Sequence, residues 1–375
     1  MIRSRNESEA AALFGEGVVR MRAGFMIEAA SLMEQAFAQT PDLPGLAQAL
    51  MTALRRDARY EDGLALAERI LAENGDDIDA RFEKAMNLVR LGEAQAALDA
   101  FDAVTALKPD HAAAWFQSHG PALDLHGLDD ALERLDRAAS QYRANGRYRG
   151  FAHAYRLLAG RNDEACERYR RDLARHPNRR IVSDGVRALL DDLAPGFRLF
   201  GVSAHMLRFA LDQAHQPGLV LEFGVRRGAS LRHIAAAAGQ TAHGFDSFAG
   251  LPENWGIAPL GALSTGLSLP EIDADIRLYP GWFEETLPAF LADHAGDVRF
   301  ANIDSDLYSS ARTVLTALAP RIVAGSVLVF DEMIGNPSWR DDEYKAFREF
   351  EAETGTRFDI IAIAPLTKQV AVRRL

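Results

Sequence analysis

Four acidic side chains follow two apolar segments in the C-terminal half of the chain. Asp304 and Asp306 come after the segment VRFANI, and Asp331 and Glu332 come after SVLVF. If these segments are neighbouring parallel strands, their carboxyl ends bring the four carboxylates together. Crowded carboxylates repel one another and retain protons, and a hard cation such as Mg²⁺ relieves this. We therefore predict that Asp304, Asp331 and Glu332 bind Mg²⁺. Asp306 would accept the proton of a substrate hydroxyl.

An earlier apolar segment, GLVLEF, runs into a glycine-containing turn. Glu222, Gly224 and Gly228 form the pattern E-x-G-x-x-x-G ahead of a helical segment. Glycine lets the backbone approach a ligand closely, and a helix N-terminus attracts an anionic group. Asp246 lies 22 residues after Gly224, a spacing at which an acid reaches the ribose hydroxyls of a nucleoside cofactor. We predict that these residues and Ser247 bind such a cofactor. The alternative for Asp246 is a role in a turn or a helix cap.

Strand-like and helical segments alternate from residue 219 onward. This alternation predicts an α/β fold with a doubly wound, mainly parallel sheet. The last two strands, FDIIAIAP and QVAVRRL, are too close in sequence for a parallel crossover and must form an antiparallel hairpin. The dinucleotide fingerprint G-x-G-x-x-G is absent. The pattern resembles the Rossmann-like class I S-adenosylmethionine-dependent methyltransferases, and this resemblance implies S-adenosylmethionine as the cofactor.

Small residues recur every 34 positions through the first half of the chain. They are Ala29, Gly63, Ala97, Ala131 and Ala165. A proline or glycine stands 12 positions after four of these five residues, and Arg143 stands there in the fourth repeat. Small residues let two helices approach closely, and proline ends a helix. The period resembles that of tetratricopeptide repeats, in which stacked helix pairs form an extended binding surface.

These patterns divide the chain into three parts. Residues 1–180 form tetratricopeptide-like helical repeats, residues 181–200 form a helical connector, and residues 201–375 form the methyltransferase domain. The repeats would bind a protein or carrier partner, or a second copy of the chain. The alternative is that they only support the catalytic domain.

Five segments of the C-terminal part together resemble the macrocin-type O-methyltransferase family. They are LEFGVRRGASL, GFDSFAGLPE, GWFEETLP, IDSDLYSSARTVL and GSVLVFDE, in this order. The resemblance implies methylation of hydroxyl groups, typically on sugars of natural products, with S-adenosylmethionine and Mg²⁺. It makes Asp304 and Asp331 metal ligands and Asp306 the general base. The family's usual pair at the last position is Asp-Asp, whereas this chain has Asp331 and Glu332.

Two further features lie near the predicted cofactor site. Trp282 follows Gly281 at the end of a strand-like segment and would cover the adenine of the cofactor, or else pack in the core. Residues 251–273 form a long segment rich in Gly, Pro and Ser. Loops of this length beside a cofactor-binding strand are often lids.

The composition argues against several classes of protein. The chain has 375 residues and a net charge of −11, which does not suit general binding to nucleic acids or anionic membranes. The single cysteine, Cys166, forms neither an intramolecular disulfide nor a multi-cysteine zinc site. The first residues lack the apolar core of a signal peptide, and no apolar run approaches the ~18 residues of a membrane helix. These features predict a cytoplasmic protein.

Three functions fit these patterns. The first is an S-adenosylmethionine-dependent O-methyltransferase acting on a sugar or another small hydroxylated molecule. The second is a non-catalytic scaffold that binds partners through its repeats. The third is a protein methyltransferase whose repeats bind the substrate chain. The converging acids Glu222, Asp246, Asp304 and Asp306 favour an enzyme, because a scaffold has no physical need for them.

Overall fold

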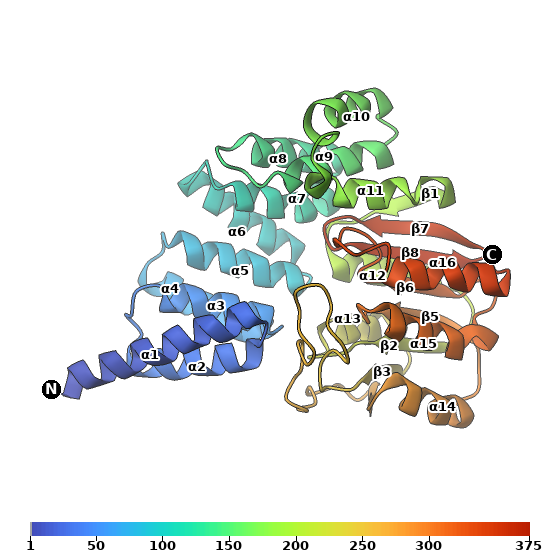
Figure 1. Ribbon diagram of the computed structural model, residues 1–375. Coiled ribbons are helices and arrows are strands. Elements are labelled where there is room, and N and C mark those ends of the chain that lie inside the picture. Colours follow the sequence, from blue (N-terminus) through green and yellow to red (C-terminus); the bar gives the residue numbers. More distant parts are fainter. Residues whose placement is uncertain (1) are drawn as a thin grey trace. The chain divides into compact units, whose positions relative to one another are not determined.

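The structure, a computed structural model, describes residues 2–375, with side chains from residue 6 onward (Figure 1). The chain forms two compact units. The first consists of Met1–Pro109 together with Phe248–Pro270, and the second consists of Asp110–Ser247 together with Glu271–Leu375. Within residues 2–375, no helix has the length and apolar character needed to cross a membrane.

The N-terminal part of the chain is built from pairs of helices. Their bounds are α1 (Ile2–Ala23), α2 (Met26–Gln39), α3 (Leu46–Arg56), α4 (Tyr60–Glu73), α5 (Ile78–Arg90), α6 (Ala94–Leu107), α7 (Ala112–His126), α8 (Leu128–Ser140), α9 (Arg147–Leu158) and α10 (Asn162–Arg168). The second helices of the pairs begin at residues 26, 60, 94, 128 and 162, so the pairs repeat every 34 residues. The predicted helical repeats are confirmed.

The small residues of the repeat lie where successive helices touch. Ala29, Ala97 and Ala131 are fully buried. A Cβ atom added to Gly63 of α4 would lie only 2.9 Å from the side-chain nitrogen of Asn87 in α5. Larger side chains at these positions would push the helices apart. The 34-residue period therefore records close contacts between helices.

The fourth helix pair ends without a proline or glycine. Helix α8 stops at Ser140, and Arg143 then adopts a φ of +57°. A residue in the left-handed region is a common way to end a helix, although it is less favourable for a residue with a Cβ atom than for glycine. The backbone of Arg143 thus takes over the role that Pro or Gly has in the other repeats.

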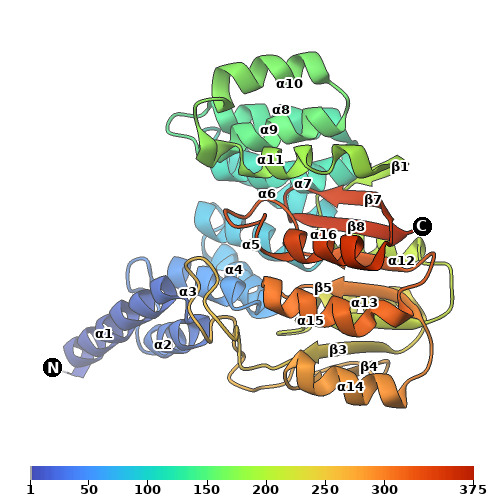
Figure 2. The same cartoon turned by 45° about the vertical axis from the view of Figure 1, so that its right-hand side comes forward.

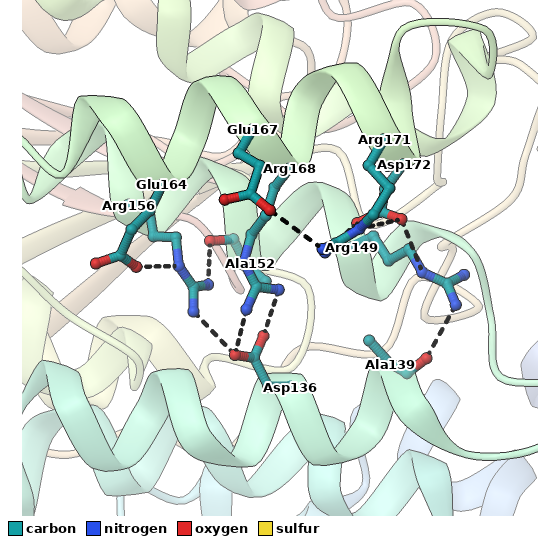
Figure 3. Close-up of polar contacts among 10 residues, drawn as sticks. All are labelled: Asp136, Ala139, Arg149, Ala152, Arg156, Glu164, Glu167, Arg168, Arg171 and Asp172. Atoms are coloured by element: carbon teal, nitrogen blue, oxygen red, sulfur yellow. Dashed lines mark hydrogen bonds and ion pairs between the residues drawn. The ribbon is translucent and has the colours of Figure 1, made fainter.

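Ion pairs fix the last helix pair against α8 (Figure 3). Asp136 of α8 accepts hydrogen bonds from Arg156 of α9 at 2.9 Å and from two nitrogens of Arg168 in α10 at 2.8 and 2.7 Å. Arg156 is buried and also donates to the carboxylate of Glu164 and to the carbonyl of Ala152. A buried guanidinium requires such partners because removing its charge from water is unfavourable. Polar contacts therefore set the packing of α8, α9 and α10.

Helices α7–α10 belong to the same compact unit as the sheet. The carboxylate of Asp124 in α7 accepts hydrogen bonds from the backbone N–H groups of Gly201 and Val202 at 2.7 and 3.1 Å. The backbones also touch directly, since a Cβ atom at Gly201 would lie 2.0 Å from the carbonyl oxygen of Gly120. The first compact unit therefore ends at Pro109, within the repeat pattern. The domain limits at residues 180 and 200 stay predictions.

The second unit contains an eight-stranded sheet. Its strands are β1 (Leu193–Leu199), β2 (Leu219–Phe223), β3 (Ala242–Asp246), β4 (Ile276–Pro280), β5 (Val298–Ile303), β6 (Val327–Phe330), β7 (Phe358–Ala364) and β8 (Gln369–Arg374). The strand order is β1-β7-β8-β6-β5-β2-β3-β4. Every neighbouring pair is parallel except the two that include β8. The predicted parallel sheet with a terminal antiparallel hairpin is confirmed.

Helices cover both faces of this sheet (Figures 1 and 2). One face carries α12 (Ser203–Asp212) and α13 (Ala229–Ala238), and the other carries α14 (Phe283–Asp293), α15 (Tyr308–Leu318) and α16 (Glu343–Thr354). The core between sheet and helices is apolar and buried, as at Leu315, Leu328 and Phe347. Burial on both faces explains why the central strands are continuously apolar.

Strand β1 corrects the expectation of a helical connector at residues 181–200. Helix α11 (Ile181–Arg187) fits it, but Leu193–Leu199 form an edge strand that pairs in parallel with β7. The sequence of β1 is LAPGFRL, and Ala194 is its one buried residue. Proline and glycine weaken strand propensity and are tolerated mainly at sheet edges. Pairing with β7, and not local sequence, makes this segment a strand.

Candidate functional site

The carboxyl ends of β2, β3, β5 and β6 meet at one edge of the sheet, because these strands are parallel neighbours. Backbone hydrogen bonds continue across this edge. The N–H of Asp304 donates to the carbonyl of Phe223 at 2.8 Å, and the N–H of Asp331 donates to the carbonyl of Ile303 at 3.0 Å. The prediction that Asp304 and Asp331 end neighbouring strands is confirmed.

The turn after β2 holds the acid that ends β3. Gly224, Arg226 and Gly228 have positive φ values of +97°, +51° and +77°. This conformation aims the N–H of Arg226 at Oδ2 of Asp246, at a distance of 2.6 Å. Helix α13 begins directly after Gly228. The turn therefore brings a carboxylate beside the N-terminus of a helix.

Gly224 is required by a neighbouring strand end. A Cβ atom at this position would lie 1.8 Å from the carbonyl oxygen of Asp304, far inside van der Waals contact. The sequence analysis explained this glycine by the approach of a ligand. The contact with Asp304 alone is sufficient to exclude any larger residue.

Glu222 is a fully buried carboxyl group within β2. Its Oε1 atom accepts a hydrogen bond from the side-chain nitrogen of Asn302 in β5 at 2.9 Å. Burial raises the pKa of Glu222 to about 8, and the nearby charges of Asp331 and Asp246 contribute in the same direction. Glu222 is therefore mostly protonated at neutral pH. No pattern in the sequence singles out Asn302 as its partner.

The predicted acids at the ends of β5 and β6 are crowded together. Burial raises the pKa of Asp304, and the negative charges of Asp331 and Asp306 raise it further. Burial also raises the pKa of Asp306, with Glu332 and Asp331 adding to the effect and Lys368 opposing it. Asp306 is 8% exposed and has a φ of +61°, so it is held in an unusual backbone conformation. The binding of a cation here would lower both pKa values.

A buried glutamate of α16 ties the two acidic loops together. The Oε1 atom of Glu343 accepts hydrogen bonds from the N–H groups of Ser305 and Asp306, both at 3.2 Å. Its Oε2 atom accepts one from the N–H of Glu332 at 3.1 Å. The sequence analysis missed Glu343, because an acid in the first turn of an amphipathic helix usually only interacts with the helix dipole.

Glu332, predicted as a metal ligand, is paired with an amino group. The Nζ atom of Lys368, in the turn between β7 and β8, lies 3.0 and 2.8 Å from its two carboxylate oxygens. Asn336 also donates to Glu332. Oδ1 of Asp331 accepts a hydrogen bond from Gln369 at 2.5 Å. Across residues 2–375, no three His, Cys, Asp or Glu side chains are arranged to hold a metal ion.

Two tryptophans differ in their surroundings. Trp282 follows Gly281, whose N–H donates to the carbonyl of Asp246 at 3.0 Å, so it comes directly after the strand end beside Asp246 and Ser247. Its side chain is partly exposed. Trp339 is only 2% exposed and contacts the ring of Tyr344, so it belongs to the core.

Residues 221–333 match a protein family described as a methyltransferase domain. This segment is a methyltransferase domain. The domain runs from within β2 to just beyond β6 and so includes the predicted residues from Glu222 to Glu332. The predicted resemblance to methyltransferases is confirmed over these residues.

Two curated relatives match parts of the chain that carries this methyltransferase domain. Demethyldecarbamoylnovobiocin O-methyltransferase of Streptomyces niveus is 36% identical over 77 residues, which are 20% of this chain and 28% of the relative. The 8-demethyl-8-(2,3-dimethoxy-alpha-L-rhamnosyl)-tetracenomycin-C 4'-O-methyltransferase of Streptomyces olivaceus is 31% identical over 143 residues, covering 31% of this chain and 53% of the relative. The chain thus spans 28% and 53% of the lengths of these two proteins.

Outside the methyltransferase domain, the helix pairs are similar to a solved structure of a thermophilic TPR protein from Thermus thermophilus. The two are 19% identical with a TM-score of 0.40, and the match covers 48% of this chain and 95% of that protein. Similarity at this level adds nothing to the 34-residue helix pairs described above.

Proposed function

We propose that the chain is an S-adenosylmethionine-dependent O-methyltransferase that acts on a hydroxyl group of a sugar or another small molecule. The observation that carries this proposal is the group of crowded carboxyls, Glu222, Asp304 and Asp306, at the strand ends of the methyltransferase domain. Both curated relatives are O-methyltransferases by name, and the name of the second specifies a rhamnosyl-bearing molecule.

The turn after β2 and the end of β3 would hold the cofactor. Asp246, kept in place by the N–H of Arg226, would accept hydrogen bonds from the ribose hydroxyls, with Ser247 beside it. The first turn of α13 after Gly228 would attract the cofactor's carboxylate. Trp282 would cover the adenine. The bound cofactor would supply a methyl group already activated by its sulfonium.

Asp306 is the proposed general base. Its carboxylate would take the proton from the acceptor hydroxyl while that oxygen forms its bond to the methyl carbon. The φ of +61° and the hydrogen bond from its N–H to Glu343 fix the position of its backbone. A base with a raised pKa is well matched to a hydroxyl, provided that the base is ionised when the substrate binds.

Magnesium enters the proposal through Asp304 and Asp331. Both residues end neighbouring strands, and the repulsion between their carboxylates is what a divalent cation would relieve. Glu332 could join them only by leaving Lys368. The ion would supply a positive charge that lowers the pKa of the acceptor hydroxyl.

Chelation of magnesium should therefore slow methyl transfer. We expect EDTA to lower the rate about tenfold or more, because the hydroxyl then loses the charge that favours its ionisation. The measurement is the rate of S-adenosylhomocysteine release with a panel of sugar acceptors, before EDTA, after it, and after excess Mg²⁺ is added back. A rate that EDTA leaves unchanged would remove magnesium from the proposal and leave the transferase itself intact.

Cofactor binding gives the most direct test of the proposed function. We expect calorimetric titration of S-adenosylhomocysteine to show micromolar binding that weakens about 100-fold in Asp246→Ala, because the ribose hydroxyls lose a charged acceptor. Asp275→Ala is a matched control, since Asp275 is an exposed aspartate ahead of β4. If the unmodified protein does not bind S-adenosylhomocysteine, the enzyme proposal is wrong and the scaffold function takes its place.

The helix pairs leave room for a further partner. We propose that they bind a protein, a carrier or a second copy of the chain, because stacked helix pairs form an extended surface in other proteins of this architecture.

A further inference from the structure

The chain leaves the sheet unit directly after the proposed cofactor residues. Strand β3 ends at Asp246, and from Phe248 to Pro270 the chain belongs to the compact unit of α1–α6. It rejoins the sheet unit at Glu271, shortly before β4. We name Phe248–Pro270 the crossing loop. Only Ser247 separates Asp246 from the start of this loop.

The crossing loop is a folded element with its own hydrogen bonds. The carbonyl of Phe248 accepts hydrogen bonds from the hydroxyl of Ser264 and the N–H of Thr265, both at 3.1 Å. The N–H of Leu251 donates to the carbonyl of Ala262 at 2.8 Å. Phe248, Leu251 and Ala262 are all at least nine-tenths buried. A loop that is closed and packed in this way moves as one piece.

The loop contacts the first helix pair. A Cβ atom added to Gly24, between α1 and α2, would lie 3.1 Å from the Cδ atom of Pro259. A Cβ atom added to Gly266 would lie 3.8 Å from the Cδ1 atom of Ile27, in the first turn of α2. The α1–α2 pair therefore supports the loop at two separate points. Both Pro259 and Gly266 lie within the crossing loop, which is drawn in gold in Figure 2.

The loop begins with a strained residue. Phe248 has a φ of +57°, a conformation that is an outlier for a bulky side chain. Such strain persists only where the surroundings hold it in place. Here the surroundings are the loop's own hydrogen bonds and its contacts with α1 and α2. Release of the loop would let Phe248 relax, and a relaxation at this residue alters the backbone at Ser247 and Asp246.

We infer that the α1–α2 helix pair is a positioning element for the cofactor residues Asp246 and Ser247 and acts on them through the crossing loop. This inference rests on the proposed function. Ile27 and Pro259 are the positioning residues, because they make the contacts between the helix pair and the loop. By linkage, a partner that binds α1–α2 and shifts the loop also changes the affinity for S-adenosylmethionine.

The test removes the two contacts and follows both the loop and the cofactor. The variant Ile27→Ala/Pro259→Ala should exchange the amide hydrogens of residues 248–270 faster than the unmodified protein. It should also bind S-adenosylhomocysteine about fivefold more weakly. Its KM for S-adenosylmethionine should rise while kcat changes little, and Ile27→Leu with Pro259 retained should restore both hydrogen exchange and affinity. Ile257→Ser is the matched control, because Ile257 lies in the same loop and is fully exposed.

Each outcome decides the inference. Faster exchange together with weaker binding supports it, provided that the control variant matches the unmodified protein and that the thermal unfolding of the double variant stays cooperative. Faster exchange with unchanged affinity overturns it, as does unchanged exchange. If the unmodified protein binds no S-adenosylhomocysteine, the proposed function fails first and the inference fails with it. Normal binding that the double variant retains contradicts the inference alone.

Discussion

Replacement of Asp306 by asparagine is expected to lower kcat for methyl transfer about 1,000-fold. Asparagine is nearly the same size, so the N–H of residue 306 can keep its hydrogen bond to Glu343. The amide cannot take a proton from the acceptor hydroxyl, and the loss therefore falls on the chemical step. The measurement is kcat with the best acceptor found, together with the affinity for S-adenosylhomocysteine, which should stay unchanged.

The dependence of the rate on pH gives a second sign of the same role. Burial and the neighbouring carboxylates raise the pKa of Asp306 above its ordinary range. A base works in its ionised form, so kcat/KM should fall as pH is lowered through this raised pKa. Asp306→Asn should lose that limb of the profile. Asp341→Asn, at an exposed position, should keep both rate and profile. A variant at Asp306 with nearly full activity would rule this residue out as the base.

Replacement of Glu222 by glutamine should make the protein more stable in mildly alkaline solution. The pKa of Glu222 is raised to about 8 in the folded chain from an ordinary value of 4.5. Between these two pH values the unfolded chain releases the proton that the folded chain keeps, so a rise in pH favours unfolding. Glutamine cannot ionise and can still accept the hydrogen bond from Asn302. We expect the variant to gain on the order of 3 kcal/mol over the unmodified protein at pH 8.

Denaturant unfolding at several pH values measures this difference. At pH 4 the two proteins should be close in stability, and the curves should separate as the pH rises to 8. Asp304 and Asp306 also have raised pKa values, so both proteins lose stability with pH, and only the difference reports on Glu222. Glu133→Gln, at an exposed position of α8, is the control. Parallel curves would mean that Glu222 is already ionised in the folded protein at neutral pH.

The acidic edge of the sheet contains its own partial compensation of charge. Lys368 neutralises Glu332, and the three backbone N–H groups that reach Glu343 solvate that buried carboxylate. Asp304 and Asp306 lie among negative charges that outweigh the more distant cations Lys368 and Arg226, and their pKa values are accordingly raised. The remaining imbalance is what a bound sulfonium or a divalent cation would correct.

Local features of the sequence determined the helix pairs and most of the sheet. The 34-residue period fixed where the second helices begin, because a small residue is needed wherever two helices touch. The apolar segments that precede Asp304 and Asp331 are strands, and the short link before β8 required an antiparallel pair. Since both periodicity and connection length act over a few residues, they can be recognised without the tertiary structure.

Tertiary structure alone decided the features that join distant parts of the chain. Strand β1 forms because β7 pairs with it, Lys368 meets Glu332 across 36 residues, and the crossing loop packs on α1–α2. None of these has a local pattern, since an edge strand, an ion pair and a loop contact depend on which surfaces the completed fold brings together. The sequence determined the acids at the strand ends, and the tertiary structure determined which of them are paired, buried or held by backbone N–H groups.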